Sequence, residues 1–219
     1  MKGNSARSTV AQKLFIGISG LFLCGFVVAH LAGNLLLYFT DKNYKAFNAY
    51  AEALHASALL PVAEIGLLVL FGAHIVMSLW MQVTNRQARP EGYAVQRSKR
   101  RSGAFSAQNV MMLSGLIVLA FIFLHLADLR FGLRFEEAGL SPSERVLQVL
   151  RDPVSAMFYT VGPLLLGYHL FHGFQSSFQS LGLGGDRFTR WTKVVGVIFA
   201  VVAAIGFASL PVWVTLFRK

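Results

Sequence analysis

The stretch GYHLFHGFQS (Gly167–Ser176) decides how this sequence is interpreted, because it places His169 and His172 inside a long apolar run. An ionisable side chain at membrane depth costs free energy and usually has a functional partner. Imidazole is a common metal ligand. Three more histidines lie in other apolar runs: His30, His74 and His125. The sequence therefore predicts a membrane protein whose buried histidines hold a metal-containing group.

The composition agrees with a polytopic helical membrane protein. Of the 219 residues, 55% are hydrophobic and 14% are charged, and the mean hydropathy is +0.55. The net charge of +10 lies mostly in the loops between apolar runs, which is a topology signal and argues against nucleic-acid binding. Cys24 is the single cysteine and no Cys-x-x-Cys-His motif occurs. Covalent c-type haem is therefore excluded.

Five apolar runs are long enough to cross a bilayer as helices. They cover residues of about 14–39, 59–83, 108–129, 154–180 and 194–217. We expect one all-α transmembrane domain over residues 1–219, with a four-helix bundle that contains the buried histidines and a fifth, peripheral helix. Amphipathic patterns predict short interfacial helices within residues 40–58 and 141–153, the second with Ser143 as a candidate cap. We expect no sequence repeat.

The distribution of positive charge predicts the topology. Of the 20 lysines and arginines, 12 lie on the side of the N-terminus and eight on the other side. The positive-inside rule therefore predicts a cytoplasmic N-terminus and an outside C-terminus. The first apolar helix is expected to be retained, because no small-residue cleavage site follows it at the usual distance.

Depth along the helices places four of the histidines in two layers. His30 and His125 lie roughly 24–26 Å from the cytoplasmic ends of their helices, and His74 and His169 roughly 14–17 Å from theirs. We call His30 and His125 the outer pair, and His74 and His169 the inner pair. Two histidines from separate helices at one depth suit a six-coordinate haem b, so the pattern predicts two haems b.

Other interpretations of these histidines are open at this point. Each could simply hydrogen-bond a neighbouring helix, or the set could hold zinc or copper. Two layers separated by roughly 10 Å fit a single-ion site poorly. Depth alone permits His169 or His172 as the partner of His74. His55, in the first connection, is interpreted as a surface histidine.

Small residues near the histidines would let a porphyrin approach the helix backbones. They lie three to seven residues from a histidine in the same helix: Gly33, Ser78, Gly162 and Gly173.

The motifs together resemble one family. The stretches are SGLFLCGFVVAHLAGNLLLY, YAEALHASALLPVAEIGLL, FGAHIV, NRQARPEGY, MMLSGLIVLAFIFLHLADLRFG and GYHLFHGFQSSFQSLGL. Their order and spacing, over nearly the whole chain, are similar to those of the diheme cytochrome b membrane-anchor subunit of succinate:quinone oxidoreductase and quinol:fumarate reductase, of the five-helix, single-anchor type.

The resemblance implies one haem ligand on each of the first four helices and none on the fifth. A glycine four residues after the ligand is typical of the fourth helix, which favours His169, followed by Gly173, over His172. His172 would then be a propionate or quinone neighbour.

The resemblance also implies the protein's partners and its place in the cell. A flavoprotein subunit with FAD and an iron–sulfur subunit would dock on the cytoplasmic face of the bacterial inner membrane, as in respiratory complex II, and a higher oligomer of that complex is an open alternative. Succinate and fumarate would react on the flavoprotein. Electrons would pass through the inner and outer haems to quinone, with menaquinone the expected species. The competing hypotheses are a stand-alone diheme cytochrome b and a non-redox transporter or assembly protein.

Polar residues near the two ends of the bundle have candidate roles. Glu64, near the level of the outer pair, is expected to take part in quinone protonation; the alternative is a helix-start carboxylate facing headgroups. Basic and polar residues at the cytoplasmic end could contact propionates or the iron–sulfur subunit, or simply carry positive-inside charge. They are Arg86, Arg89, Arg97 to Arg101, Gln175 and Ser176.

Overall fold

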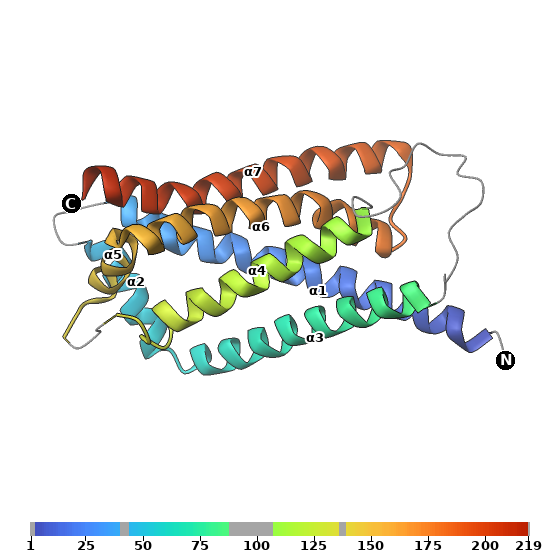
Figure 1. The fold of residues 1–219 in the computed structure, drawn as a ribbon, viewed down its shortest axis with the longest axis horizontal. Coiled ribbons are helices and arrows are strands. Elements are labelled where there is room, and N and C mark those ends of the chain that lie inside the picture. The colour runs from blue at the N-terminus through green and yellow to red at the C-terminus, as the bar shows by residue number, and fades with distance from the viewer. Residues whose placement is uncertain (1–2, 40–43, 88–106, 136–138, 219) are drawn as a thin grey trace.

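The computed structural model describes residues 3–39, 44–87, 107–135 and 139–218, which form helices joined by turns (Figure 1). In chain order these are α1 (Gly3–Leu35), η1 (Leu36–Tyr38), α2 (Lys45–Ala56), α3 (Leu59–Gln87), α4 (Ala107–Leu129), α5 (Pro142–Arg151), α6 (Pro153–Ser180) and α7 (Asp186–Phe217). No strand occurs in these four segments. The all-α prediction is therefore confirmed.

Five of the helices are long and apolar enough to cross a membrane. The spans are Val10–Tyr38, Leu59–Asn85, Asn109–Leu129, Pro153–Ser180 and Asp186–Phe217. Four match the expected ranges closely, and the fifth begins eight residues earlier than expected. Its start follows Gly185, whose φ of 121° suits glycine, and Asp186 puts a carboxylate in the first turn, where the helix dipole favours it.

The two expected amphipathic helices, α2 and α5, both form and lie at the same end of the bundle (Figure 1). The cap of α5 is Ser141 rather than Ser143, so that prediction is wrong. Ser141 and Glu144 form a reciprocal capping box, and Pro142 occupies the first helical turn. Ser143 is the second residue of α5, and its backbone N–H donates to Oδ1 of Asn48 at 2.8 Å. This contact joins α5 to α2.

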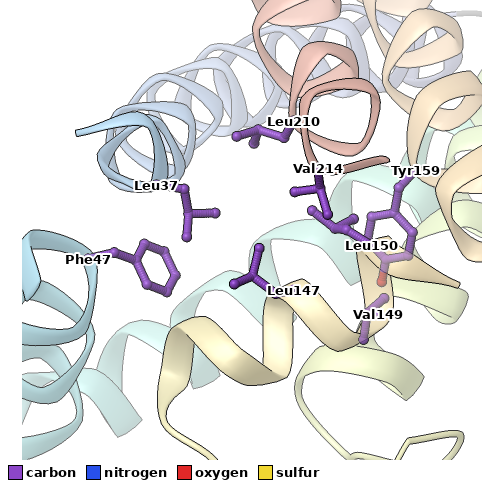
Figure 2. Packing of buried hydrophobic residues seen from close by; sticks show 8 residues of the cluster. All are labelled: Leu37, Phe47, Leu147, Val149, Leu150, Tyr159, Leu210 and Val214. Carbon is purple, nitrogen blue, oxygen red and sulfur yellow. The ribbon is translucent and has the colours of Figure 1, made fainter. Parts of the chain in front are cut away.

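An apolar cluster closes the bundle at the α2 and α5 end (Figure 2). It combines buried side chains from η1, α2, α5, α6 and α7: Leu37, Phe47, Leu147, Val149, Leu150, Tyr159, Leu210 and Val214. The interfacial helices therefore bury their apolar faces against the ends of the spanning helices.

Close backbone contact joins α6 and α7. A Cβ placed on Gly167 would lie 2.5 Å from Cβ of Ala204 and 2.9 Å from the carbonyl oxygen of Ala200. Small residues permit such approach, which drives helix association in lipid. Because α7 lies against α6 on the side away from α3 (Figure 1), the fifth span is peripheral to the other four, as expected.

The span in α3 has the lowest buried share of the five: none of its most apolar window is buried, against 39% in α6. Polar contacts tie α3 to α1 and α4. They are Glu64 with Arg130, His74 with Ser19, and Gln82 with Asn109. The third bond runs from Nε2 of Gln82 to Oδ1 of Asn109 at 3.1 Å. Together with the contact between the Phe26 and Phe71 rings, 6.1 Å between centroids, these polar pairs hold α3 against its neighbours.

The two halves of the chain repeat one arrangement. Each has a long helix, an amphipathic helix and a second long helix: α1–α2–α3 and α4–α5–α6. An offset of 95 positions relates SGLFLCGFVVAHLA (19–32) to SGLIVLAFIFLHLA (114–127), with seven of 14 residues identical. The same offset relates His74 to His169. The expectation of no repeat is therefore wrong; the apolar residues between the shared positions differ because many apolar side chains serve equally well against lipid.

Candidate functional site

The four histidines of the two predicted pairs lie on four different helices, each half of the repeat supplying one to each pair. In the outer pair, the ring centroids of His30 on α1 and His125 on α4 are 5.8 Å apart, with the rings nearly perpendicular at 85°. In the inner pair, His74 on α3 and His169 on α6 are close enough to interact electrostatically. The fold therefore brings together both members of the outer pair and sets the inner pair near one another.

Each inner histidine is held by a Ser-Gly dipeptide on a neighbouring helix. Oγ of Ser19 is 2.9 Å from Nδ1 of His74. In the other half, Oγ of Ser114 is 3.0 Å from Nδ1 of His169. Both serines are buried, at 2% and 4% exposure. The two halves therefore build the same contact twice.

The glycine after each serine leaves room for the imidazole. A Cβ on Gly20 would lie 3.4 Å from Cε1 of His74, and one on Gly115 would lie 3.2 Å from Cε1 of His169. A larger side chain at either position would press on the ring.

The serine contacts suit the imidazole tautomer that has its proton on Nδ1. Ser19 donates its hydroxyl proton to the carbonyl oxygen of Ile16, at 3.1 Å. A hydroxyl has one proton, so while Ser19 donates to Ile16 its oxygen can accept from the Nδ1–H of His74. In that tautomer Nε2 of His74 keeps its lone pair, the form in which imidazole binds a metal.

The same reasoning applies to the second half. Ser114 donates to the carbonyl oxygen of Met111 at 3.1 Å, and its oxygen is free to accept from Nδ1–H of His169. In this arrangement Nε2 of both inner histidines carries no proton.

Aromatic rings surround the outer pair. Phe26 stacks on His30 at 5.3 Å and 15°, and Phe121 lies 6.0 Å from His125; each phenylalanine precedes its histidine by four residues. Nδ1 of His125 is buried and has no hydrogen-bond partner within the part of the chain that the structure describes. A buried polar atom without a partner is costly in the chain alone.

This donor set fits haem b. A six-coordinate haem takes one imidazole on each side of its iron, and the site offers two such pairs from facing helices. The inner pair has Nε2 free of protons, and glycine lies against both rings. The outer pair has two rings 5.8 Å apart, nearly perpendicular, and an unsatisfied imidazole nitrogen. His30, His74, His125 and His169 are the residues that would hold the two groups.

A buried carboxylate near the outer pair is absent from the sequence predictions. Asp128, 1% exposed, is three residues beyond His125. Its carboxylate accepts two hydrogen bonds from Arg134, at 2.5 and 2.6 Å, and one from the hydroxyl of Tyr159 at 3.1 Å. Arg134 also donates to Ser155 at 3.0 Å. The sequence does carry a signal for Asp128, because a carboxylate one turn after His125 in an apolar helix is expected to have a partner.

His172 has a different environment from His169. Its ring makes perpendicular contacts with Tyr168 at 5.0 Å and Phe171 at 4.9 Å, both on its own helix. His55 is exposed on α2.

Glu64 forms an exposed ion pair. Its carboxylate accepts from Nε and Nη2 of Arg130 at 3.0 and 3.1 Å, which joins the start of α3 to the end of α4. At the opposite end, Gln175 is half-buried and Ser176 is exposed. Arg89 and residues 97–101 lie outside the described residues, as does the side chain of Arg86.

Two of the small residues expected to admit a porphyrin contact aromatic rings instead. A Cβ on Gly33 would lie within 3.0 Å of the Tyr50 ring, and one on Gly162 would overlap the Phe121 ring. Gly173 is more open, since a Cβ there would meet only the methyl group of Met111, at 3.5 Å. The expectation is therefore wrong for Gly33 and Gly162, because intervening side chains fill those positions.

The chain matches no protein-family model, no curated protein and no solved structure. The five apolar helices indicate a lipid bilayer as its environment.

Proposed function

We propose that this chain is the diheme cytochrome b membrane anchor of a succinate:quinone oxidoreductase or quinol:fumarate reductase, with menaquinone as the expected quinone. Haem bound at the two histidine pairs would supply one-electron transfer between an iron–sulfur subunit and quinone. Succinate and fumarate would react on a flavoprotein partner carrying FAD.

The observation that supports the proposal is the pairing of four histidines from four helices, with each inner histidine in contact with a buried serine through Nδ1. A histidine that only joined two helices would need no common tautomer and no mate at its own depth. Here Ser19 and Ser114 act on His74 and His169 in the same way, 95 residues apart. The same serine contact at His74 and at His169 supports the same ligand role for both histidines.

The chain's own residues would hold and orient the two haems. His74 and His169 would each present Nε2 to one iron, and His30 and His125 would do so for the other. The aromatic cluster at Phe26 and Phe121 would keep water from the outer pair.

Partner subunits are proposed for the cytoplasmic face. The loop of residues 84–107 has six lysines and arginines against one acid, which suits docking of an acidic protein surface and the positive-inside rule alike. In this topology the outer pair and the C-terminus face the outside.

The deciding experiment measures haem per chain, by the pyridine haemochrome method, on the complex purified through a tag on this chain. Two haems b per chain and co-purification of flavoprotein and iron–sulfur subunits support the proposal. Two haems without those subunits would indicate the stand-alone diheme cytochrome b instead. No haem would exclude both and favour a transporter or assembly protein.

Glu64 is proposed to act in quinone protonation at the outer end. Its carboxylate is 39% exposed and paired with Arg130, so it is accessible at the bundle surface. Glu64→Gln should lower quinone turnover and leave both haem spectra intact. Unchanged quinone turnover would contradict this role and leave Glu64 only its structural ion pair with Arg130.

A further inference from the structure

We propose that the buried carboxylate of Asp128 places a negative charge beside His125 and thereby stabilises the oxidised form of the outer haem. Asp128 is then a positioning residue, since it acts from beside a ligand. This inference rests on the proposed function, because it requires a haem held by His30 and His125.

The first step is the place of the carboxylate. Asp128 follows His125 by three residues on α4, about one helical turn, and the two side chains are close enough to interact electrostatically. The ring of Tyr159, a buried residue labelled in Figure 2, links them. Its centroid is 5.9 Å from that of His125, and its hydroxyl donates to Oδ2 of Asp128 at 3.1 Å. The carboxylate therefore lies next to one ligand of the outer pair.

The second step is the orientation of the ion pair. Nε and Nη2 of Arg134 donate to the two carboxylate oxygens of Asp128, and Nη2 also donates to Ser155. The side chain of Asp128 is fully buried, whereas that of Arg134 is 35% exposed. The negative end of the pair therefore lies inside the bundle with His125, and the positive end lies nearer the surface, where it is better screened.

The third step is that the repeat does not account for this network. The offset of 95 positions relates His30 to His125, so the two ligands of the outer pair are equivalent. Applied to Asp128, Arg134 and Tyr159, the same offset gives Gly33, Phe39 and Glu64. The same contacts cannot form in the first half, yet His30 still reaches its place. Holding an outer histidine therefore does not require the network, which calls for another role.

The fourth step is electrostatic. A haem held by two neutral imidazoles has one more positive charge when its iron is oxidised than when it is reduced. A fixed negative charge nearby favours the oxidised form, and it does so more strongly in a buried site than in water. The dielectric environment is among the means by which a protein sets a haem potential. The outer haem should therefore be harder to reduce with Asp128 present than without it.

The experiment is a potentiometric titration of the b-type absorbance bands of the purified complex with Asp128→Asn. The outer haem is identified as the one that remains in His169→Ala. We expect the outer potential to rise, and the ratio of reduced to oxidised outer haem to increase by about three- to tenfold at a fixed potential. The inner potential should change less, because the inner pair lies one layer deeper in the bundle.

A second variant, Arg134→Gln, separates the charge of Asp128 from a purely structural role of the ion pair. Glutamine keeps an N–H donor for the carboxylate but removes the positive charge, so the outer potential should fall. If the ion pair served only to join the chain beyond α4 to the core, both variants would loosen the same contact. The outer potential would then shift in the same direction in both.

Asp152→Asn is the matched control. Asp152 is a carboxylate at the same end of the bundle, where it caps α6 by accepting from the backbone N–H of Ser155 at 2.8 Å. Asparagine also caps helices, so this variant removes a charge and keeps the cap. It should shift the outer potential much less than Asp128→Asn does. An equal shift would overturn the inference, because a charge beside His125 would then have no special effect.

The outcomes separate the inference from the proposed function. Two bound haems with an unchanged or lowered outer potential in Asp128→Asn would overturn the inference and leave the function standing. Absence of haem from the unaltered complex would overturn the function, and the inference with it. If Asp128→Asn loses the outer haem, Arg134→Gln decides: a lowered outer potential supports the inference, and any other result overturns it.

Discussion

His169 and His172 are three residues apart on α6, and their surroundings predict different roles. His169 is bonded to Ser114 of α4, whereas His172 contacts Tyr168 and Phe171, which are 47% and 41% exposed. We expect His169→Ala to bind one haem per chain and His172→Ala to bind two. Haem content and the absorbance spectrum of the purified chain measure this. Loss of a haem from His172→Ala would reverse the assignment.

Asp128 and Glu64 each accept two hydrogen bonds from an arginine, but they differ in burial. The side chain of Asp128 is fully buried, and that of Glu64 is 39% exposed. Asp128→Asn should lower the free energy of unfolding by about 1.5–3 kcal/mol, because hydrogen bonds to a buried charge contribute that much.

Glu64→Gln is the matched control for Asp128→Asn, and should change the free energy of unfolding by less than about 1 kcal/mol, as exposed ion pairs do. Unfolding in mixed detergent micelles gives both values. Equal losses in the two variants would show that burial does not set the strength of these pairs.

At the scale of the helices, glycine contacts decide which spans pack tightly. Gly167 lies against Ala200 and Ala204 of α7, whereas a Cβ on Gly25 of α1 would meet nothing within 4 Å. Gly167→Ala should destabilise the protein by about 1–3 kcal/mol through overpacking. Gly25→Ala should be neutral or slightly stabilising, since alanine favours helix more than glycine does. Thermal unfolding in detergent tests the pair, and a harmless Gly167→Ala would mean that α6 and α7 can separate freely.

The sequence was sufficient to predict the spans, because an apolar run of some 20 residues has few alternatives to a membrane helix. It was also sufficient to single out the four histidines, because a titratable side chain in such a run is conspicuous; their role as haem ligands stays a prediction. It was insufficient for Ser19 and Ser114, because a hydroxyl in a helix usually satisfies its own carbonyl and gives no sign of a second partner. The network of Asp128 was missed because its partner Arg134 lies beyond the end of α4 and reaches back to it.

The cap of α5 shows the same limit on a smaller scale. Ser141 and Ser143 both precede the amphipathic pattern, and only the capping-box spacing from Ser141 to Glu144 separates them. The bond from Ser143 to Asn48 depends on how α2 and α5 pack, and no local pattern encodes that packing.

On the scale of the whole molecule, one side of the bundle is tightly packed and the other is tethered. Gly167 seats α7 on α6, and the apolar cluster of Figure 2 closes one end. On the other side, α3 has no buried residue in its most apolar stretch, and it contacts its neighbours through polar pairs at its two ends and at His74 and through the ring of Phe71. A haem bound between His74 and His169 would add the packing contacts that α3 lacks. Because His74 is the one proposed ligand on α3, the position of this helix and the occupancy of the inner site should be linked.

This linkage predicts a pattern of hydrogen exchange. A ligand that binds only the folded protein stabilises it in proportion to its occupancy, and local openings close most where the ligand adds the most contact. Haem loading should therefore slow amide exchange most in α3 (Leu59–Gln87) and least in α7, measured by mass spectrometry on haem-loaded and haem-depleted protein in the same detergent. His74→Ala is the matched control, since it removes the tether of α3 to the inner site while His30 and His125 keep the outer one. In that variant the protection of α3 should fall toward the haem-depleted level although one haem remains bound. Equal protection of α3 and α7 on loading would contradict the linkage, because it would mean that α3 is held in place by the chain alone.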